Sequence, residues 1–247
     1  MVSFLSKSKQ AKPKPPEAID WAARFRELSL TCNDERLRFF YESGAVNPDT
    51  PLSEVPFVAL DFETTGLNPR KDDIVSVGLV PFDIHRVRCR DARHWIVNPR
   101  QALAEESVVI HGITHSDISD APDLKRIMEQ LLEALAGCIV VVHYRYIERS
   151  FLNEALKARI NEGILFPVVD TMELEARRHR TGGSIFWSRL MGRRPTSIRL
   201  ADSRLRYNLP HYSQHHALTD AVATAELLQA QIANQYAPDT PISEIWL

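Results

Sequence analysis

The amino-acid sequence predicts an α/β fold of three layers, with a mixed central sheet and a helical extension in front of it. Three observations support this prediction. Apolar runs of strand length alternate with amphipathic helical segments along most of the chain. Two of these runs are joined by the short segment DIHR, which predicts an antiparallel hairpin. A third run, CIVVVH, is β-branched and uninterrupted, as expected of a strand that is buried on both faces.

The region before the first strand divides into two parts. The first sixteen residues carry four lysines and three prolines without a continuous apolar core, so neither a secretory signal nor a membrane span fits them. We interpret residues 1–18 as a disordered basic tail. Residues 19–54 show helical periodicity and form the predicted extension. Its apolar stripes are Trp21, Phe25 and Leu28 in a first helix and, after a cap at Asn33, Leu37, Phe40 and Tyr41 in a second.

The main domain is predicted over residues 55–235, with residues 236–247 as a C-terminal tail. Short β-branched or alternating runs predict its strands, and apolar side chains at helical spacing predict its helices. In chain order we predict strands at 57–61, 74–82 and about 87–97, a helix at 124–136, a strand in the run CIVVVH at 138–143, a helix at 147–159, a strand at 166–170, a helix from 172 and a last helix at 217–234.

Composition excludes several classes of protein. The chain has 247 residues, 44% of them hydrophobic and 25% charged, with a formal net charge of -2. This balance fits a globular protein with a sizeable core and argues against a generally basic coat for nucleic acid. No apolar run reaches the length of a membrane span. Cys32, Cys89 and Cys138 lack metal-site spacing, which disfavours structural zinc and favours a reducing compartment, so we expect a cytoplasmic protein.

The first strand ends in an unusual pair of acids. In the segment VPFVALDFETTGLNP, Asp61 and Glu63 follow an apolar run and are separated by one residue. Alternate residues of a strand point to the same face, roughly 7 Å apart. Two like charges at the end of a buried strand repel one another and resist desolvation, unless a cation or a strong set of donors compensates. On its own, DFET also fits a strand that leads into an acidic turn.

Two further acids fall where this fold brings them beside the first pair. Glu148 opens the helix that follows CIVVVH, and Asp220 lies one turn inside the last helix. His215 precedes Asp220 by five residues, which is about 140° of helical rotation, so both cannot share a helix face. We therefore place His215 in the preceding loop. As an alternative, Glu148 is an ordinary acid at a helix start, favoured there by the helix dipole.

Four carboxylates that converge at the end of a sheet make a poor hydrophobic core and a good site for hard divalent cations. Oxygen ligands of this kind select Mg²⁺, with Mn²⁺ as a substitute, and a pair of such ions stabilises both the attacking and the leaving oxygen in phosphoryl chemistry. A histidine beside them supplies a base. The constellation predicts hydrolysis of a phosphodiester by activated water.

Three segments carry a family resemblance. The motifs DFETTG at 61–66, HYRYIERSFL at 143–152 and HHALTDA at 215–221 resemble, in order and spacing, those of the DEDDh 3'-5' exonucleases, which include the epsilon subunit of DNA polymerase III. The segments IHGIT at 110–114 and DTMELEARR at 170–178 resemble stretches of the epsilon-like branch. The resemblance covers roughly residues 55–235. It implies a ribonuclease H-like fold, an exonuclease domain there, two divalent metal ions, and removal of nucleotides one at a time from a 3' end.

Carried over by position, the resemblance assigns roles to individual residues. Asp61, Glu63, Glu148 and Asp220 are the expected metal ligands, and His215 is the expected base. The expected contacts of the terminal nucleotide are Thr64, Thr65, Gly66, Leu67 and His111, although a histidine in a polar loop is also compatible with a merely solvated side chain. The second motif departs from the family twice, with Glu148 in place of aspartate and Tyr144 in place of asparagine.

Two other features allow a functional or a structural interpretation. Between Arg177 and Arg206 the chain has nine arginines and one acid, with aromatic side chains interleaved. Such a segment fits a flap that binds single-stranded nucleic acid, and equally a solvated basic surface. His143 ends a buried strand, and we interpret it as a hydrogen-bonded structural histidine.

The leading hypothesis is a metal-dependent 3'-5' exonuclease that releases nucleoside monophosphates from single-stranded or frayed DNA. One alternative keeps the chemistry and takes RNA or short oligoribonucleotides. Another is a non-catalytic module that binds nucleic acid. The expected partner is single-stranded nucleic acid with DNA favoured, without a membrane, and the sequence names no polymerase or other protein partner.

Overall fold

The computed structural model of the chain describes residues 19–101, 112–180, 196–213 and 215–247. Three sequence predictions fall outside these ranges. They are the disordered basic tail at 1–18, the contact of His111 with the terminal nucleotide, and the central part of the arginine-rich segment at 181–195. All other predicted elements can be compared with the structure.

A mixed five-stranded sheet forms the middle layer, in the order β3-β2-β1-β4-β5. Its strands are β1 (Phe57–Thr64), β2 (Ile74–Phe82), β3 (Arg93–Ile96), β4 (Ile139–Val142) and β5 (Val168–Asp170). Strand β2 pairs antiparallel with both β1 and β3, whereas β1, β4 and β5 are parallel. The carboxyl ends of the three parallel strands therefore meet at one edge, where ligand sites of open α/β sheets are commonly found.

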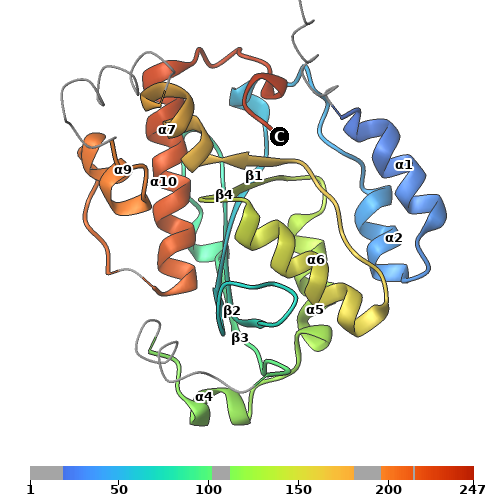
Figure 1. The fold of residues 1–247 in the computed structure, drawn as a ribbon. Coiled ribbons are helices and arrows are strands. Elements are labelled where there is room, and N and C mark those ends of the chain that lie inside the picture. Colours follow the sequence, from blue (N-terminus) through green and yellow to red (C-terminus); the bar gives the residue numbers. More distant parts are fainter. Residues whose placement is uncertain (1–18, 102–111, 181–195, 214) are drawn as a thin grey trace, which may run out of the picture.

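Helices cover both faces of the sheet, which confirms the predicted three layers (Figure 1). One face packs against α1 (Trp21–Thr31), α2 (Glu35–Glu42), α5 (Leu124–Leu135) and α6 (Tyr146–Ile160). The other packs against α7 (Thr171–His179) and α10 (Ala217–Gln235), with α9 (Leu200–Arg206) outside them. The short α4 (His115–Ser119) lies beyond the sheet.

The alternation of side chains along β1 decides which layer receives the acids. Val58, Leu60 and Phe62 point into the core beneath α5 and α6. Phe57 and Ala59 point into the core beneath α10. The period of two continues to the end of the strand, so the next odd-numbered positions, which are the two acids of β1, face the layer of α10.

The predicted hairpin is present, but its second strand is shorter than expected. Phe82 and Val87 form an isolated antiparallel bridge around the turn. A 3₁₀ turn at Cys89–Asp91 then interrupts the extended chain, so that β3 starts only at Arg93. The sequence prediction of one strand over 87–97 is therefore wrong in its first half. The other predicted strands and helices of the domain are found within about two residues, except that β1 runs on to Thr64.

Both chain segments that flank the predicted main domain join its cores. Phe25 of α1 packs on Phe40 of α2, and Phe40 contacts Phe166 just before β5. The cap of α2 is Asp34 rather than the predicted Asn33, because the Asp34 carboxylate accepts the N–H of Arg36 at 3.0 Å. At the other end, residues 236–247 pair with β5, since the backbone groups of Leu247 and Val168 exchange two hydrogen bonds.

Two observations concern the environment of the protein. Among the residues that the structure describes, no helix is long and apolar enough to cross a membrane. Cys32, Cys89 and Cys138 are free thiols, of which Cys89 is exposed.

Candidate active site

The end of β1 positions the first two carboxylates. Asp61 lies opposite Gly78 and Glu63 lies opposite Ser76 on the neighbouring strand β2. Both pairs are antiparallel, and a bulge follows between Glu63 and Thr64. Bulges re-aim the chain at the edge of a sheet and are common beside active sites. The two acids therefore stand on one face at the point where the strand turns away.

Gly78 allows the last helix to approach these acids closely. A Cβ atom at this position would lie 2.3 Å from the backbone nitrogen of Leu218 and 2.3 Å from the carbonyl carbon of Ala217. Such distances are impossible for any other residue, so the first turn of α10 rests on the sheet only because residue 78 is a glycine. Asp220 belongs to this turn. The close approach places it over the strand that carries Asp61 and Glu63.

Three of the predicted ligands form one cluster. An oxygen from each of Asp61, Glu63 and Asp220 lies within 4.8 Å of the others. Glu63 and Asp220 are buried, with 9% of each residue exposed, and Asp61 is partly exposed. No Lys or Arg forms an ion pair with the cluster within the described part of the chain. The structure thus brings together three acids from the first and third motifs.

Glu148, from the first turn of α6, is the fourth acid at this edge. Its side chain is buried, with 2% of the residue exposed, and its Oε2 atom has no hydrogen-bond partner among the described residues. It lies close enough to Asp61 to raise the pKa of that carboxyl. It does not belong to the compact group of three, so the predicted set of four ligands is only partly drawn together.

Burial and mutual repulsion raise the pKa values of these carboxyls. Burial raises the pKa of Asp61 well above its ordinary value, and Glu148, Asp220 and Glu63 raise it further. Burial and the charge of Asp220 raise the pKa of Glu63 to about 7. Burial also raises the pKa of Asp220, against the hydrogen bond from the His215 backbone, and that of Glu148. The fold therefore holds four acids in a place where negative charge is disfavoured.

The donor set fits divalent metal ions. A buried carboxylate oxygen without a partner costs free energy unless something binds it, and Glu148 provides such an atom beside Asp61. Carboxylate oxygens are the preferred ligands of Mg²⁺ and Mn²⁺. A cation bound among these acids would offset both their burial and their repulsion.

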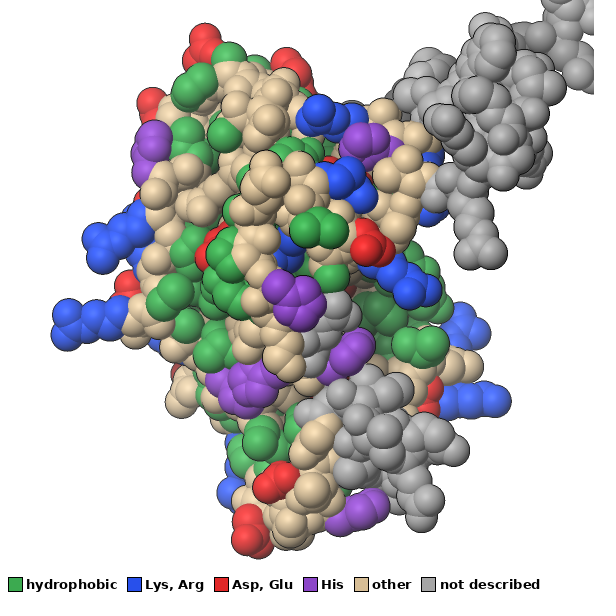
Figure 2. All heavy atoms as spheres, turned by 90° about the vertical axis from the view of Figure 1, so that its left-hand side faces the viewer, with side chains coloured by type: hydrophobic (Ala, Val, Ile, Leu, Met, Phe, Trp, Pro, Cys, Tyr) green, Lys and Arg blue, Asp and Glu red, His purple; other side chains and the backbone are tan. Residues whose placement is uncertain are grey.

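His215 lies in the loop before α10, as predicted. Its backbone N–H donates to Oδ2 of Asp220 at 2.8 Å, and its φ of +68° is in the left-handed region. The side chain is exposed. The next residue, His216, caps α10 through its ring and packs on His94 of β3, with the ring centroids 4.7 Å apart. Figure 2 shows this side of the molecule, where several histidine side chains gather.

The end of β1 and the loop after it hold four of the five predicted contacts of the terminal nucleotide, and the fifth, His111, lies outside the described residues. Thr65 is buried, its N–H donates to the Asp73 carbonyl at 2.9 Å, and its hydroxyl accepts the N–H of Asp73 at 3.0 Å. The hydroxyl of Thr64 donates to the carbonyl of Gly66 at 2.6 Å. Leu67 is 79% exposed at the tip. Thr65 therefore closes the loop, and Leu67 is the most exposed of the four described members of the set.

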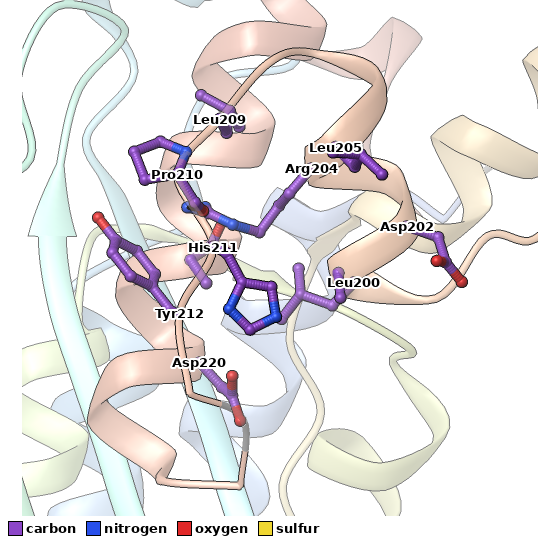
Figure 3. Close-up of a pocket in the computed structure, with 11 residues that line it drawn as sticks. Leu200, Asp202, Arg204, Leu205, Leu209, Pro210, His211, Tyr212 and Asp220 are labelled. Carbon is purple, nitrogen blue, oxygen red and sulfur yellow. Dashed lines mark hydrogen bonds between the residues drawn. The ribbon is translucent and has the colours of Figure 1, made fainter.

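A pocket that the sequence did not predict lies beside Asp220. It has a volume of about 200 Å³ and is lined by Leu200 and Leu205 of α9 on one side and by His211 and Tyr212 on the other (Figure 3). The only sequence signal was that the lining loop directly precedes the third motif. The pocket adds apolar surface next to Asp220, which lies beside the carboxylates of Asp61 and Glu63 on its other side.

The described arginines of the segment 177–206 contradict part of the flap interpretation. Arg204 is buried, with 3% exposed, and donates to the carbonyl of Ala223 at 2.6 Å and to Glu226 at 2.7 Å. Arg206 is ion-paired with the fully buried Glu175. These two side chains hold α9 against α10 and α7. They are structural, so at most the remainder of the segment is available for phosphate groups.

His143 is structural, as predicted. Its ring nitrogens lie 2.8 Å from the hydroxyl of Thr171 and 3.1 Å from the carbonyl of Ile198. Burial lowers the pKa of His143 to about 4. The neutral ring therefore connects the end of β4 to the start of α7 and to the chain before α9.

Sequence comparison identifies the family. The sequence profile of the Exonuclease family matches residues 58–228, a span that includes the four acids and His215. The chain belongs to the Exonuclease family. This exonuclease-family chain is 30% identical over 179 residues to the DNA polymerase III subunit epsilon-like protein of Rhodobacter capsulatus, covering 72% of this chain and 24% of that protein. It is 27% identical over 180 residues to the DNA polymerase III subunit epsilon of Treponema pallidum, covering 73% and 78%.

The match spans only a minor part of several of these relatives, such as 12% of the DNA polymerase III PolC-type of Thermotoga maritima. Solved structures agree on the fold. Cell-death related nuclease 4 superposes with a TM-score of 0.61 at 19% identity, covering 76% of this chain and 67% of that one. The nuclease domain of 3'hExo, a DEDDh family member, gives 0.60 at 14% identity, covering 73% and 92%. The predicted resemblance and the ribonuclease H-like fold class are confirmed.

Proposed function

We propose that this chain is a metal-dependent 3'-5' exonuclease that removes nucleoside monophosphates from single-stranded or frayed DNA. The observation that carries the proposal is the cluster of the partly exposed Asp61 with the buried Glu63 and Asp220, which has no cationic partner among the described residues and lies beside Glu148, whose buried Oε2 atom also has no partner. Burial of this kind is unfavourable for a structural site. It is the arrangement that a site for two divalent cations requires.

Each residue has a part in the proposed reaction. Asp61, Glu63 and Asp220 would hold the cations, and the orphaned oxygen of Glu148 would complete the set. Divalent cations bound there would supply an activated water and neutralise charge on the phosphodiester. The exposed ring of His215, tethered to Asp220 through its backbone N–H, would take the proton of the attacking water. Leu67, exposed at the tip of its loop, would contact the terminal base.

Similar structures support the choice of substrate. Exonuclease X, with a TM-score of 0.55 at 20% identity over 72% of this chain, was solved with 5' overhanging duplex DNA. Exonuclease I of E. coli, at 0.53, was solved with a dT13 oligonucleotide. A 3'-exonuclease that recognises a histone mRNA stem-loop is also similar, at 0.58, and for this reason RNA is the second candidate substrate.

The test is hydrolysis of single-stranded DNA and RNA oligomers of the same sequence and of about 20 nucleotides, labelled at the 5' end. Each oligomer is incubated with the protein in EDTA, in Mg²⁺ or in Mn²⁺. Digestion from the 3' end shortens the labelled strand step by step, whereas digestion from the 5' end releases the label at once. We expect a ladder with DNA and a metal ion, and none in EDTA. An oligomer with a blocked 3' end is the matched substrate control.

Three other outcomes would change the proposal. Faster digestion of RNA would replace DNA with RNA as the substrate. Immediate release of the 5' label would contradict the polarity. Binding of both oligomers without hydrolysis in any metal ion would favour the non-catalytic module.

A further inference from the structure

Two aromatic side chains stand exposed next to the proposed active site. Tyr144 is 46% exposed and Tyr146 is 49% exposed. Their ring centroids lie 5.9 Å apart and the ring planes are tilted by 37°. The pair precedes Glu148 by one helical turn or less, at the carboxyl end of β4. Exposed aromatic rings in this arrangement are available to stack on flat ligands.

The backbone at this point is built to present the rings. Tyr144 has a φ of +91°, a strained conformation for a bulky residue. The buried carboxylate of Asp170 accepts the N–H of Tyr144 at 3.1 Å and the N–H of Arg145 at 3.0 Å. The same carboxylate caps α7. One buried acid therefore fixes the strained turn, and the strain at Tyr144 is compensated from within the fold.

Two adjoining pockets lie over the start of α6, one lined by both rings and the other by Tyr146 alone of the two, and together we call them the groove. Its two halves have volumes of about 450 and about 390 Å³ and share Tyr146, Arg149 and Ser150. At one end lies Ile198, and at the other lie Pro69 and Arg70. The groove thus begins directly beyond the loop of the predicted terminal-nucleotide contacts. It passes over the helix that carries the proposed ligand Glu148.

The groove also holds two arginines that form no ion pair. Its acids have cationic partners of their own: Asp170 pairs with Arg145 at 3.2 Å, Glu173 with Arg177 at 3.4 Å and Glu154 with Lys157 at 2.9 Å. Within the described residues, Arg70 and Arg149 form no ion pair with a carboxylate. Arg149 donates to the carbonyl of Phe166 through one nitrogen, and its guanidinium lies over the ring of Trp21 at 5.6 Å from the centroid, which leaves N–H groups at its edge for a phosphate.

We propose that this groove binds the single-stranded nucleotides that precede the scissile bond, with bases stacked on Tyr144 and Tyr146 and phosphates beside Arg70 and Arg149. The inference rests on the proposed exonuclease function, because it takes its substrate from there. Stacking is tolerant of base identity, so the groove would confer a preference for single strands rather than for a sequence.

The test measures equilibrium binding of a fluorescein-labelled octathymidylate by the full chain in EDTA, where hydrolysis is absent. Y144A with Y146A should raise Kd by about 100-fold, which is about tenfold for each lost stacking partner. Y144F with Y146F keeps both rings and should stay within about twofold of the parent. The matched control is F39A, since Phe39 of α2 is 54% exposed and lies elsewhere.

Length dependence gives a second readout. The dinucleotide pTpT reaches only the proposed catalytic end, so the alanine variant should lose much less affinity for it than for the octamer. R70Q should reduce the slope of log Kd against the logarithm of the salt concentration by about 0.7, the contribution of one phosphate contact on a single strand. Circular dichroism of each variant checks the fold.

The results separate the two proposals. Equal octamer affinity in the parent and the double alanine variant, or an equal loss in F39A, would overturn the groove. Tyrosine-dependent binding without release of mononucleotides in Mg²⁺ would overturn the proposed exonuclease function while keeping the groove. Hydrolysis by the parent together with tyrosine-independent binding would overturn the groove while keeping the proposed exonuclease function.

Discussion

Two groups of largely buried acids in this molecule differ in their partners. The site acids are Asp61, Glu63, Glu148 and Asp220, and the paired acids are Asp73 and Glu175. Asp73 accepts from Arg159 and from Arg100, each at 2.9 Å. Glu175 accepts from Arg206, from the Tyr207 hydroxyl at 2.9 Å and from the Gln231 amide at 2.9 Å. The site acids have no such cations among the described residues.

The pKa directions follow this difference. Burial works to raise the pKa of Asp73, but hydrogen bonds from Arg159 and Arg100 outweigh it and hold that pKa below its ordinary value. Burial likewise works to raise the pKa of Glu175, and Arg206, Gln231 and Tyr207 overcome it. For Asp61 and Glu63 burial and repulsion by neighbouring site acids act together and raise the pKa, and burial is the main cause that raises it for Glu148 and Asp220. Paired acids thus hold the fold together, whereas the site acids require a ligand from outside.

Removing a site acid should give the largest effect. We expect D61N to lower hydrolysis by about 10³-fold or more, because preorganised groups at developing charge contribute on that scale. The same substitution should stabilise the metal-free protein, since it removes a buried, repelled charge. Initial rates and urea unfolding in EDTA measure the two quantities. A destabilised D61N protein would place Asp61 among the structural acids.

Removing a paired acid should do the opposite. E175Q leaves Arg206 without its buried partner and should lower the free energy of unfolding by about 3 kcal/mol, the size found when buried ion pairs are broken. Hydrolysis by the folded protein should stay close to that of the parent, because Glu175 lies between α7, α9 and α10 and outside the cluster of site acids. Unfolding curves unchanged from the parent would remove the distinction between the two groups.

The two groups should also respond to pH with opposite sign. Glu63 has a pKa of about 7 in the folded metal-free protein against an ordinary 4.5. The folded state keeps that proton longer, so stability should fall as pH rises from 4.5 to 7, by something on the order of 3 kcal/mol. E63Q should flatten this decline. An unchanged pH profile in E63Q would count against the raised pKa.

Glu175 supplies the counterpart of that experiment. Its folded pKa is lowered, so its contribution to stability is present above the unfolded value of about 4.5 and is lost as pH falls through the folded pKa. The stability difference between the parent and E175Q should therefore shrink on acidification. A difference that grows at low pH would contradict the assignment.

Replacing the proposed base, His215, while leaving the proposed metal ligands in place should give the smallest of these effects. H215N keeps a residue type that tolerates the left-handed backbone at this position and should lower turnover by about 10²-fold, the usual contribution of a positioned base. Metal-free stability should stay close to that of the parent, because the tether to Asp220 is a backbone N–H. Higher pH should partly restore the rate. An unchanged rate at neutral pH would exclude His215 as the base.

The sequence predicted most of the fold because its signals were local. The helix predicted at 124–136 is observed at Leu124–Leu135, since its apolar stripe and the following glycine define both ends. The run at 74–82 is found unchanged. The seven-residue α9 was missed because its arginines Arg204 and Arg206 bind Glu226 and Glu175, partners that are distant in the chain. A basic composition alone does not distinguish such contacts from a free surface.

The site was predictable only where spacing constrains geometry. The strand period placed Asp61 and Glu63 on one face, and helical rotation placed His215 outside the helix of Asp220. The role of Gly78 depends on a helix that lies 139 residues further along the chain at Ala217, and nothing local announces it. The sequence marks Asp170 only as the first residue of a family motif, although its carboxylate fixes the turn at Tyr144.

Thermal unfolding with and without Mn²⁺ tests the central claim most directly, that the site acids hold divalent cations whereas the paired acids do not. At a Mn²⁺ concentration of about 100 times Kd, binding to the folded state alone should stabilise the parent by about 2.7 kcal/mol. E175Q starts from a lower melting temperature and should gain as much as the parent. D61N should gain little or nothing. A stabilisation of D61N equal to that of the parent would contradict the account, because the cation would then bind elsewhere.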